Sequence, residues 1–171
     1  HAMLQCLSKM ARFHSFEPFP DSFEASACTL ALNGLKQVTL HRCAVGKEAG
    51  TVPFAVARGK GNASLAAGMH ITADAETTLH TITVPVVPID DLVPATRRVT
   101  VLHLDVEGFE VDALYGAARI LAKSKPIVVL EGSKRFHLRK YLRTLHEVAP
   151  KAGYVHAGQI DHNSVYRPGL A

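Results

Sequence analysis

The 171-residue sequence has no tryptophan, few aromatic residues (6 %) and only three cysteines. Because single-stranded nucleic acid is usually held by stacking on aromatic rings, the scarcity of aromatics argues against a nucleic-acid partner. Cys6, Cys28 and Cys43 are odd in number and lack C-x-x-C spacing. That pattern argues against a disulfide framework or a zinc site and favours a reducing compartment, so we expect a cytoplasmic protein.

No apolar stretch approaches the length of a membrane span and no signal peptide is visible, so we expect no membrane partner. The ten histidines form no H-x-H or H-x-x-x-H pair, so no metal site is assigned to them. With 47 % hydrophobic and 20 % charged residues, the chain can form a core. We expect a single domain over residues 3–171, with His1-Ala2 as a vector remnant before Met3.

Positive charge is concentrated in one segment, Lys134 to Arg143, of a chain whose formal net charge is only +4. Arg135, Arg139 and Arg143 share one helical face, and leucines form an apolar stripe at helical spacing. We interpret this segment as an amphipathic helix with a solvated basic face. A surface that binds an anion is the alternative.

The hydrophobic pattern predicts an order of strands and helices typical of βαβ units. Strands are expected at residues 12–17, 38–45, 51–57, 78–87, 99–104, 127–131, 154–157 and 164–166. Helices are expected at residues 3–10, 21–32, 111–121 and 134–148. Pro53 suggests that the strand at 51–57 lies at a sheet edge. The strands at 99–104 and 127–131 are apolar throughout, as in parallel strands buried on both faces, so we expect an α/β fold with helices on both faces of the sheet.

Three of the expected strands are followed by, or end in, acidic residues: Glu17, then Asp105 and Glu107, then Glu131. In an open α/β sheet, ligands bind at the carboxyl ends of the strands. A single acid at this position is usually the N-cap of the next helix, but three corresponding positions indicate a ligand crevice. Carboxylates gathered in a crevice repel one another, so some must pair with cations, hold protons or accept hydrogen bonds.

These acids suit different tasks. An acid after an early strand can accept both hydroxyls of a ribose through its two oxygens, which is the role expected for Glu17. Asp105, Glu107 and Glu131 could bind a divalent cation, accept a proton from a substrate hydroxyl, or hydrogen-bond a sugar. Glu110 starts the next expected helix, so we interpret it as a partner of the helix dipole and not as a catalyst.

Six successive motifs, from about Phe13 to Glu131, resemble those of FkbM-type methyltransferases. They are F-E-P-F-P-D-S-F, L-A-L-N-G-L, A-V-G-K-E-A-G, G-N-A-S-L, L-D-V-E-G-F-E and I-V-V-L-E. The fifth motif is the most specific of them. The resemblance implies an O-methyltransferase that uses S-adenosylmethionine and has a Rossmann-like fold with a mostly parallel sheet.

The resemblance also implies roles for individual residues. Glu17 corresponds to the acid that binds the ribose of S-adenosylmethionine, Ala44 and Val45 lie where the chain passes the adenine, and Ser64 lies near the cofactor. Asp105, Glu107 and Glu131 correspond to acids that face the transferred methyl group and the acceptor. Asp105 or Glu107 is expected to act as the base or as a cation ligand, and Glu131 to contact the substrate or support the others.

One feature of the family is missing. Its first strand and a glycine-rich turn of the kind D-x-G-A-x-x-G do not precede Phe13, and a central strand would therefore be absent from the sheet. His103 stands where the family often has lysine, a second departure. Two hypotheses follow: a truncated methyltransferase, or a degenerate domain that serves as a non-catalytic binding or assembly module.

The acceptor does not follow from the motifs. The family's substrates include hydroxyls of sugars and of polyketides or other natural products, so a small-molecule or carbohydrate partner is expected. The loop from Arg58 to His80 is expected to decide among acceptors. A homo-oligomer is left open by the sequence.

Overall fold

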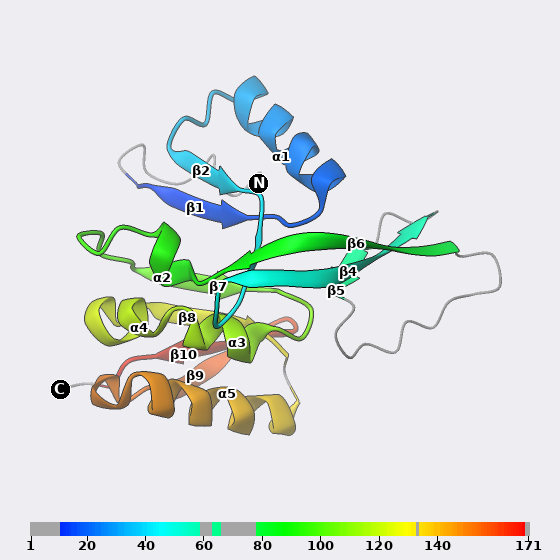
Figure 1. Ribbon diagram of the computed structural model, residues 1–171. Coiled ribbons are helices and arrows are strands. Elements are labelled where there is room, and N and C mark those ends of the chain that lie inside the picture. Colours follow the sequence, from blue (N-terminus) through cyan, green and yellow to red (C-terminus); the bar gives the residue numbers. More distant parts are fainter. Residues whose placement is uncertain (1–10, 59–62, 66–77, 133, 170–171) are drawn as a thin grey trace.

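The computed structural model describes residues 11–58, 63–65, 78–132 and 134–169 (Figure 1). Its strands are β1 (Phe13–Phe16), β2 (Val38–His41), β3 (Ala44–Val45), β4 (Gly50–Arg58), β5 (Ala63–Leu65), β6 (Thr78–Val87), β7 (Val101–Leu104), β8 (Ile127–Glu131), β9 (Val155–Ile160) and β10 (Asn163–Arg167). Its helices are α1 (Pro20–Leu32), α2 (Ile89–Leu92), α3 (Glu110–Tyr115), α4 (Ala118–Ser124) and α5 (Arg135–Val148), with a 3₁₀ turn, η2 (Pro150–Ala152). The helix expected over residues 3–10 lies outside the described residues.

The strands form three sheets that contain both parallel and antiparallel pairs. β1 and β2 form a parallel pair. The second sheet has the order β7-β8-β10-β9, in which only β7 and β8 are parallel. The third has the order β3-β6-β4-β5, in which β4 is antiparallel to both neighbours. The fold is therefore mixed α/β, and the expected mostly parallel sheet is found only in part, because short hairpins such as β9–β10 require antiparallel pairing.

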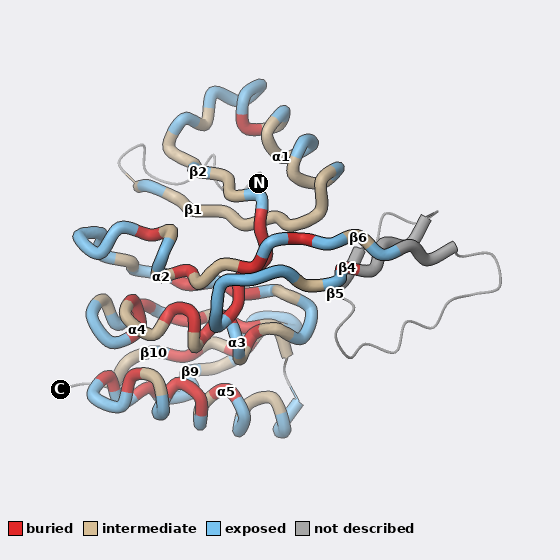
Figure 2. Tube along the Cα trace, in the orientation of Figure 1, coloured by how far each residue is buried: buried red, intermediate tan, exposed pale blue. Residues whose placement is uncertain are grey.

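The helices of the second sheet lie on one side of it. Figure 1 shows α3, α4 and α5 in front of the strands β8, β10 and β9. Along β7, Leu102 and Leu104 are buried, whereas Val101 and His103 are exposed, and β8 alternates in the same way (Figure 2). Because side chains alternate along a strand, β7 and β8 bury one face. The expectation that they are buried on both faces is wrong for the described part of the chain.

The main core lies between this sheet and its helices. Leu114 of α3, Ile120 and Leu121 of α4 and Leu145 of α5 pack in one cluster with the inward side chains of β7 and β8. Full burial of each large aliphatic side chain contributes about 1.5–3 kcal/mol. This core holds β7 and β8 together and so fixes the edge at which both strands end.

Two elements expected to be continuous are divided. The strand expected at residues 38–45 becomes β2 and β3, which belong to different sheets. The helix expected at 111–121 is divided into α3 and α4 at Gly116 and Ala117. A Cβ atom on Gly116 would lie 2.0 Å from the carbonyl oxygen of Gly46, so the close approach of the two backbone segments requires glycine there.

The edge position expected for the strand at 51–57 is also wrong. β4 lies between β6 and β5. However, β5 pairs only with the stretch from Phe54 to Val56, so Pro53 lies just outside it. The missing N–H of Pro53 therefore costs no hydrogen bond to β5.

A pair of histidines joins β1 to β2. Nδ1 of His14 and Nε2 of His41 are 3.0 Å apart, and the rings are stacked with their centroids 5.3 Å apart. Burial and then the charge of Arg97 lower the pKa of His14, and burial and then His14 lower the pKa of His41. A nitrogen–nitrogen hydrogen bond needs one donor and one acceptor, so the bond is lost when both imidazoles are protonated.

We expect the folded state to lose stability as the pH falls from about 7.5 to about 5.5. Folding lowers both pKa values. As the pH falls through the usual histidine pKa of about 6.5, the two histidines therefore take up protons in the unfolded chain at a higher pH than in the folded chain, and this favours unfolding. Urea unfolding midpoints at the two pH values measure the loss. The loss of stability should be smaller in the double variant His14→Gln, His41→Gln. The variant His103→Gln, an exposed change on β7, should show the same loss as the wild type. An undiminished loss in the double variant would contradict this assignment.

Candidate active site

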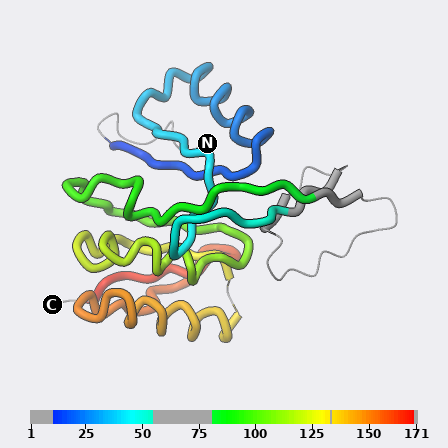
Figure 3. The backbone as a smooth tube through the Cα atoms, viewed as in Figure 1, coloured from blue at the N-terminus to red at the C-terminus, as the bar shows by residue number. Residues whose placement is uncertain are grey.

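Three acid-bearing segments lie at the carboxyl ends of strands. Glu17 directly follows β1, Asp105 directly follows β7, and Glu131 is the last residue of β8. β7 and β8 pair in parallel with Leu104 opposite Leu130, which places the next two residues, Asp105 and Glu131, at neighbouring strand ends. Figure 3 shows that these segments come from separate parts of the chain. The expectation that parallel strands bring acids to one edge is confirmed for β7 and β8.

A cavity of about 300 Å³ joins the segments that carry Glu17 and Asp105, whereas Glu131 is not among the residues that line it. This volume is at the lower end of the range for small-molecule sites. Three of the four residues expected at a cofactor, Glu17, Ala44 and Val45, line it, and so do Asp105 and Glu107. The other residues of the lining are Phe16, Pro18, Cys43, Phe54 and Val106. The cavity therefore has an apolar wall from β3 and β4 and acidic groups from the loops after β1 and β7.

The carboxylates of Asp105, Glu107 and Glu131 form a cluster. Each offers an oxygen, and these oxygens all lie within 4.8 Å of one another. Burial, and then the charges of Asp105 and Glu107, raise the pKa of Glu131, which also shares a hydrogen bond with Asp105. A hydrogen bond between two carboxyl groups requires a proton on one of them. The cluster can therefore hold a proton, take one from a ligand, or bind a cation.

The turn that carries Asp105 and Glu107 has an unusual backbone. Glu107 has φ 52° and Gly108 has φ 99°, so two successive residues lie in the left-handed region. For a residue with a side chain this conformation costs about 1–2 kcal/mol. Glu110 stabilises the turn: its Oε1 accepts hydrogen bonds from the backbone N–H of Val106 at 3.2 Å and of Gly108 at 3.3 Å. Glu110 is thus more than a partner of the helix dipole.

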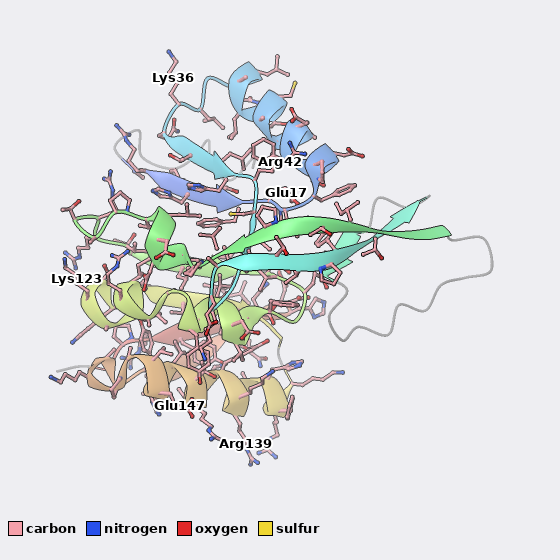
Figure 4. All side chains as sticks on the ribbon, viewed as in Figure 1. Glu17, Lys36, Arg42, Lys123, Arg139 and Glu147 are labelled. Atoms are coloured by element: carbon pink, nitrogen blue, oxygen red, sulfur yellow. The ribbon has the colours of Figure 1, made fainter. Side chains whose placement is uncertain are left out.

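Glu17 leaves part of its hydrogen-bonding capacity for a ligand. Its Oε1 accepts the backbone N–H of Phe19 at 2.9 Å. The residue is half-buried and lines the cavity. Figure 4 shows Glu17 between the β1 end of the molecule and the crossing strands β4 and β6. The acid is therefore held in one orientation by its own turn.

Residues 4–155 match the family model of the methyltransferase FkbM domain. The chain belongs to this family. The structure also resembles the crystal structure of methyltransferase FkbM from Methylobacillus flagellatus KT, with a TM-score of 0.63 and 17 % sequence identity over 91 % of this chain. At that identity the likeness shows the fold alone. No curated protein is significantly similar to the chain.

The chain spans 36 % of the length of that solved FkbM protein. Within the described residues, this FkbM domain has no helix of the length and apolarity that crossing a membrane requires. The backbone of Ser64 lies in β5, opposite Ala55 of β4, but its side chain falls outside what the structure describes. Most of the loop from Arg58 to His80, expected to select the acceptor, is likewise not described.

Several lining residues of the FkbM domain were not singled out from the sequence. Cys43 is buried, which raises the pKa of its thiol, and it lies beside Ala44 in the cavity wall. Phe54 lies in the same wall and stacks on Phe19, with ring centroids 6.3 Å apart. In the sequence, apolar residues of a cavity wall look the same as core residues. The A-V-G motif next to Cys43 was therefore the one feature of the sequence that indicated this wall.

The basic helix expected over residues 134–148 is α5. Figure 4 shows Arg139 and Glu147 on the side of α5 that points away from the sheet. Arg143 Nε lies 2.9 Å from Glu147 Oε1, an ion pair one helical turn apart on an exposed face. Such exposed pairs contribute little stability, which agrees with a solvated face.

We expect Glu131→Gln to raise the melting temperature (Tm) at about pH 7.5. Folding raises the pKa of Glu131, so its carboxyl group loses its proton less readily in the folded chain than in the unfolded chain. Above the folded pKa, the charged form of Glu131 therefore lowers the stability of the folded state. Solvent screens the effect, and we expect a gain of about 1–3 °C, as roughly 0.5–1 kcal/mol gives in a domain of this size. The gain should vanish near pH 4, where Glu131 is protonated in the native chain. Thermal unfolding measures both.

Glu147→Gln is the matched control. Tyr115 and Arg143 lower the pKa of Glu147, so removal of its charge should give no gain in Tm. A fall in Tm for Glu131→Gln at neutral pH would show that the three carboxylates do not repel one another as described.

Proposed function

We propose that this FkbM domain belongs to a cytoplasmic O-methyltransferase that uses S-adenosylmethionine and acts on a hydroxyl of a sugar or another natural product. The observation that carries the proposal is the shared cavity: Glu17, Ala44 and Val45 line it together with Asp105 and Glu107. β1 and β7, whose ends lie at this cavity, each belong to a parallel pair, which supports a Rossmann-like arrangement of the site. Binding of S-adenosylmethionine or its product is the direct test.

The lining fits the cofactor by its chemistry. The carboxylate of Glu17 is an acceptor suited to the paired hydroxyls of a ribose. Val45 and Phe54 are buried apolar groups suited to the flat face of an adenine. The acids Asp105 and Glu107 suit the positively charged end of the molecule. One cavity thus brings polar and apolar groups together.

The carboxylates support a simple proton transfer. S-adenosylmethionine, when bound, supplies a methyl group on a positively charged sulfur. Asp105 or Glu107 would take the proton of the acceptor hydroxyl, and the oxygen of that hydroxyl would receive the methyl group from the sulfur. The raised pKa of Glu131 makes Glu131 a stronger base than an isolated carboxylate, and its hydrogen bond to Asp105 gives it a path to receive the proton. The protein's main contribution is to hold the two reactants in line.

A divalent cation is the alternative ligand of Asp105, Glu107 and Glu131. Mg²⁺ binds carboxylate oxygens, and three acids at one edge provide them. If these acids bind the cation, Mg²⁺ should raise the Tm of the wild type and leave that of Glu131→Gln nearly unchanged. If they act only as a base, Mg²⁺ should not distinguish the two proteins.

A non-catalytic binding or assembly module is the second candidate function. Among the described residues, β1 is hydrogen-bonded only to β2, and β7 only to β8, so each has an unpaired edge. Unpaired edges can take up a strand from a partner or from a second copy. The module reading therefore predicts association in solution, and a monodisperse monomer that binds S-adenosylhomocysteine would favour the enzyme.

Glu17→Gln should weaken binding of S-adenosylhomocysteine by about 10- to 100-fold, measured by isothermal titration calorimetry. The substitution removes the charge that strengthens the hydrogen bonds to the ribose, and such bonds contribute about 1.5–3 kcal/mol each. Glu24→Gln, an exposed change in α1, is the matched control and should leave the affinity unchanged.

The binding test separates the hypotheses. Equal affinity of Glu17→Gln and wild type would remove Glu17 from the site. Binding by a version extended before His1, but not by this chain, would show that part of the site lies outside these residues. No binding by either version would contradict the enzyme and favour the module.

A further inference from the structure

The cluster of Asp105, Glu107 and Glu131 needs support, because like charges at short range push the strand ends apart. Asp105 and Glu107 lie in the turn after β7, whereas Glu131 ends β8. The pairing of β7 with β8 stops at Leu104 and Leu130, although β8 remains paired with β10 as far as Glu131. The two segments are therefore held beyond the end of the β-ladder by other contacts.

Glu110 supplies the first of these contacts. It is only 4 % exposed and does not line the cavity. Its Oε1 accepts the N–H groups of Val106 and Gly108, at 3.2 and 3.3 Å, and so ties the turn to the first residue of α3. Two backbone donors on one carboxylate oxygen fix the turn that carries Asp105 and Glu107.

Tyr141 of α5 supplies the second contact and reaches both segments. Its hydroxyl donates to the carbonyl oxygen of Glu131 at 2.9 Å and lies 3.3 Å from Oε2 of Glu110. Tyr141 is 4 % exposed, and burial followed by the charge of Glu110 raises its pKa, so the hydroxyl stays protonated and available as a donor. One hydroxyl thus connects the end of β8 to the turn after β7.

The Tyr141 ring is itself fixed in place. The ring of His137 stacks on it with centroids 5.9 Å apart and planes 16° apart. His137 also packs over Gly132, the residue after Glu131, where a Cβ atom would lie 2.7 Å from Nδ1. Gly132 has φ 111°, a conformation that favours glycine. The end of β8 therefore fits closely against α5.

We propose that Glu110 and Tyr141 are a positioning pair, which sets the distance between the acids after β7 and Glu131 at the end of β8. Neither residue lines the cavity, and the pair acts through the backbone of Val106, Gly108 and Glu131. Its effect on methyl transfer rests on the proposed function, but its effect on the turn does not. Both can be measured separately.

The chain offers a matched control for the tyrosine. Tyr154 is fully buried, and its hydroxyl donates to the carbonyl oxygen of Pro126 at 2.9 Å. Pro126 precedes β8, so this bond is of the same kind as that of Tyr141 but lies at the opposite end of the same strand. Tyr141→Phe and Tyr154→Phe each remove one buried hydroxyl and should cost comparable stability.

Amide hydrogen exchange, followed by NMR, tests the pair. Tyr141→Phe should speed exchange at Val106 and Gly108 by tenfold or more, because Glu110 loses the contact that holds its carboxylate. Tyr154→Phe should leave exchange at these two amides within about twofold of the wild type. Unchanged exchange in Tyr141→Phe, or equal acceleration in both variants, would overturn the proposal.

Variants of Glu110 provide a second test that does not depend on the folding of Tyr141→Phe. Glu110→Gln keeps an oxygen that can accept both N–H groups and should keep exchange slow. Glu110→Leu has similar size but no acceptor and should accelerate exchange at Val106 and Gly108. Equal exchange in the glutamine and leucine variants would contradict the role of the Glu110 oxygen.

Binding of S-adenosylhomocysteine gives the functional readout. Tyr141→Phe should weaken it by about 3- to 10-fold, because the turn lines the cavity, and Tyr154→Phe should not change it. If neither the wild type nor the extended version binds S-adenosylhomocysteine, the proposed function fails while the exchange result still decides the positioning pair. If the wild type binds and Tyr141→Phe binds equally well, the pair does not position this site.

Discussion

Repulsion among the carboxylates of Asp105, Glu107 and Glu131, whose oxygens lie within 4.8 Å of one another, is the constraint that the surrounding structure must meet. Parallel pairing of β7 and β8 creates it, because parallel strands end at the same edge. The core beneath these strands and the contacts of Glu110 and Tyr141 oppose it. Burial, and then the charges of Asp105 and Glu107, raise the pKa of Glu131, so protonation of Glu131 relieves the repulsion at a higher pH than for an isolated carboxylate.

The apolar part of the cavity depends on a different feature, the short β3. After β2 the chain leaves the β1–β2 sheet, and Ala44 and Val45 pair with the end of β6. This change of sheet places Cys43 to Val45 in the lining of the cavity, together with Glu17 and the turn after β7. The contact between Gly46 and Gly116 fixes the chain after β3 against the start of α4. The cavity therefore depends on packing between elements far apart in the sequence.

Local pattern predicted the acids but not their environment. Apolar runs that end in Asp105 and Glu131 gave β7, β8 and the shared edge, because strand direction and side-chain type are local properties. The exposure of Val101 was not predicted, because the sequence of an apolar strand does not show whether a helix covers each of its faces. The link from Glu110 to Tyr141 joins residues 31 positions apart and depends on how α5 packs, which no local pattern contains.

The division of the strand expected at 38–45 was missed for the same reason. Residues from Val38 to Val45 have strand-like composition throughout, and only the tertiary structure decides that Arg42 and Cys43 turn the chain between two sheets. The family resemblance predicts that Ala44 and Val45 lie beside a cofactor; both line the cavity, and their contact with a cofactor stays a prediction. A resemblance of motifs thus conveyed spatial information that periodicity could not.

The energetic character of the site bears on the choice between an enzyme and a module. A module that binds a strand at an unpaired edge needs neither three crowded carboxylates nor a left-handed Glu107, and both features oppose folding. Groups that reduce stability and line a cavity are typical of sites that bind or transform a ligand. Glu110 and Tyr141 stabilise this arrangement, but they do so by burying the carboxylate of Glu110, which itself costs stability. This cost is explained if the three acids act together on one ligand. The site therefore favours the methyltransferase over the module.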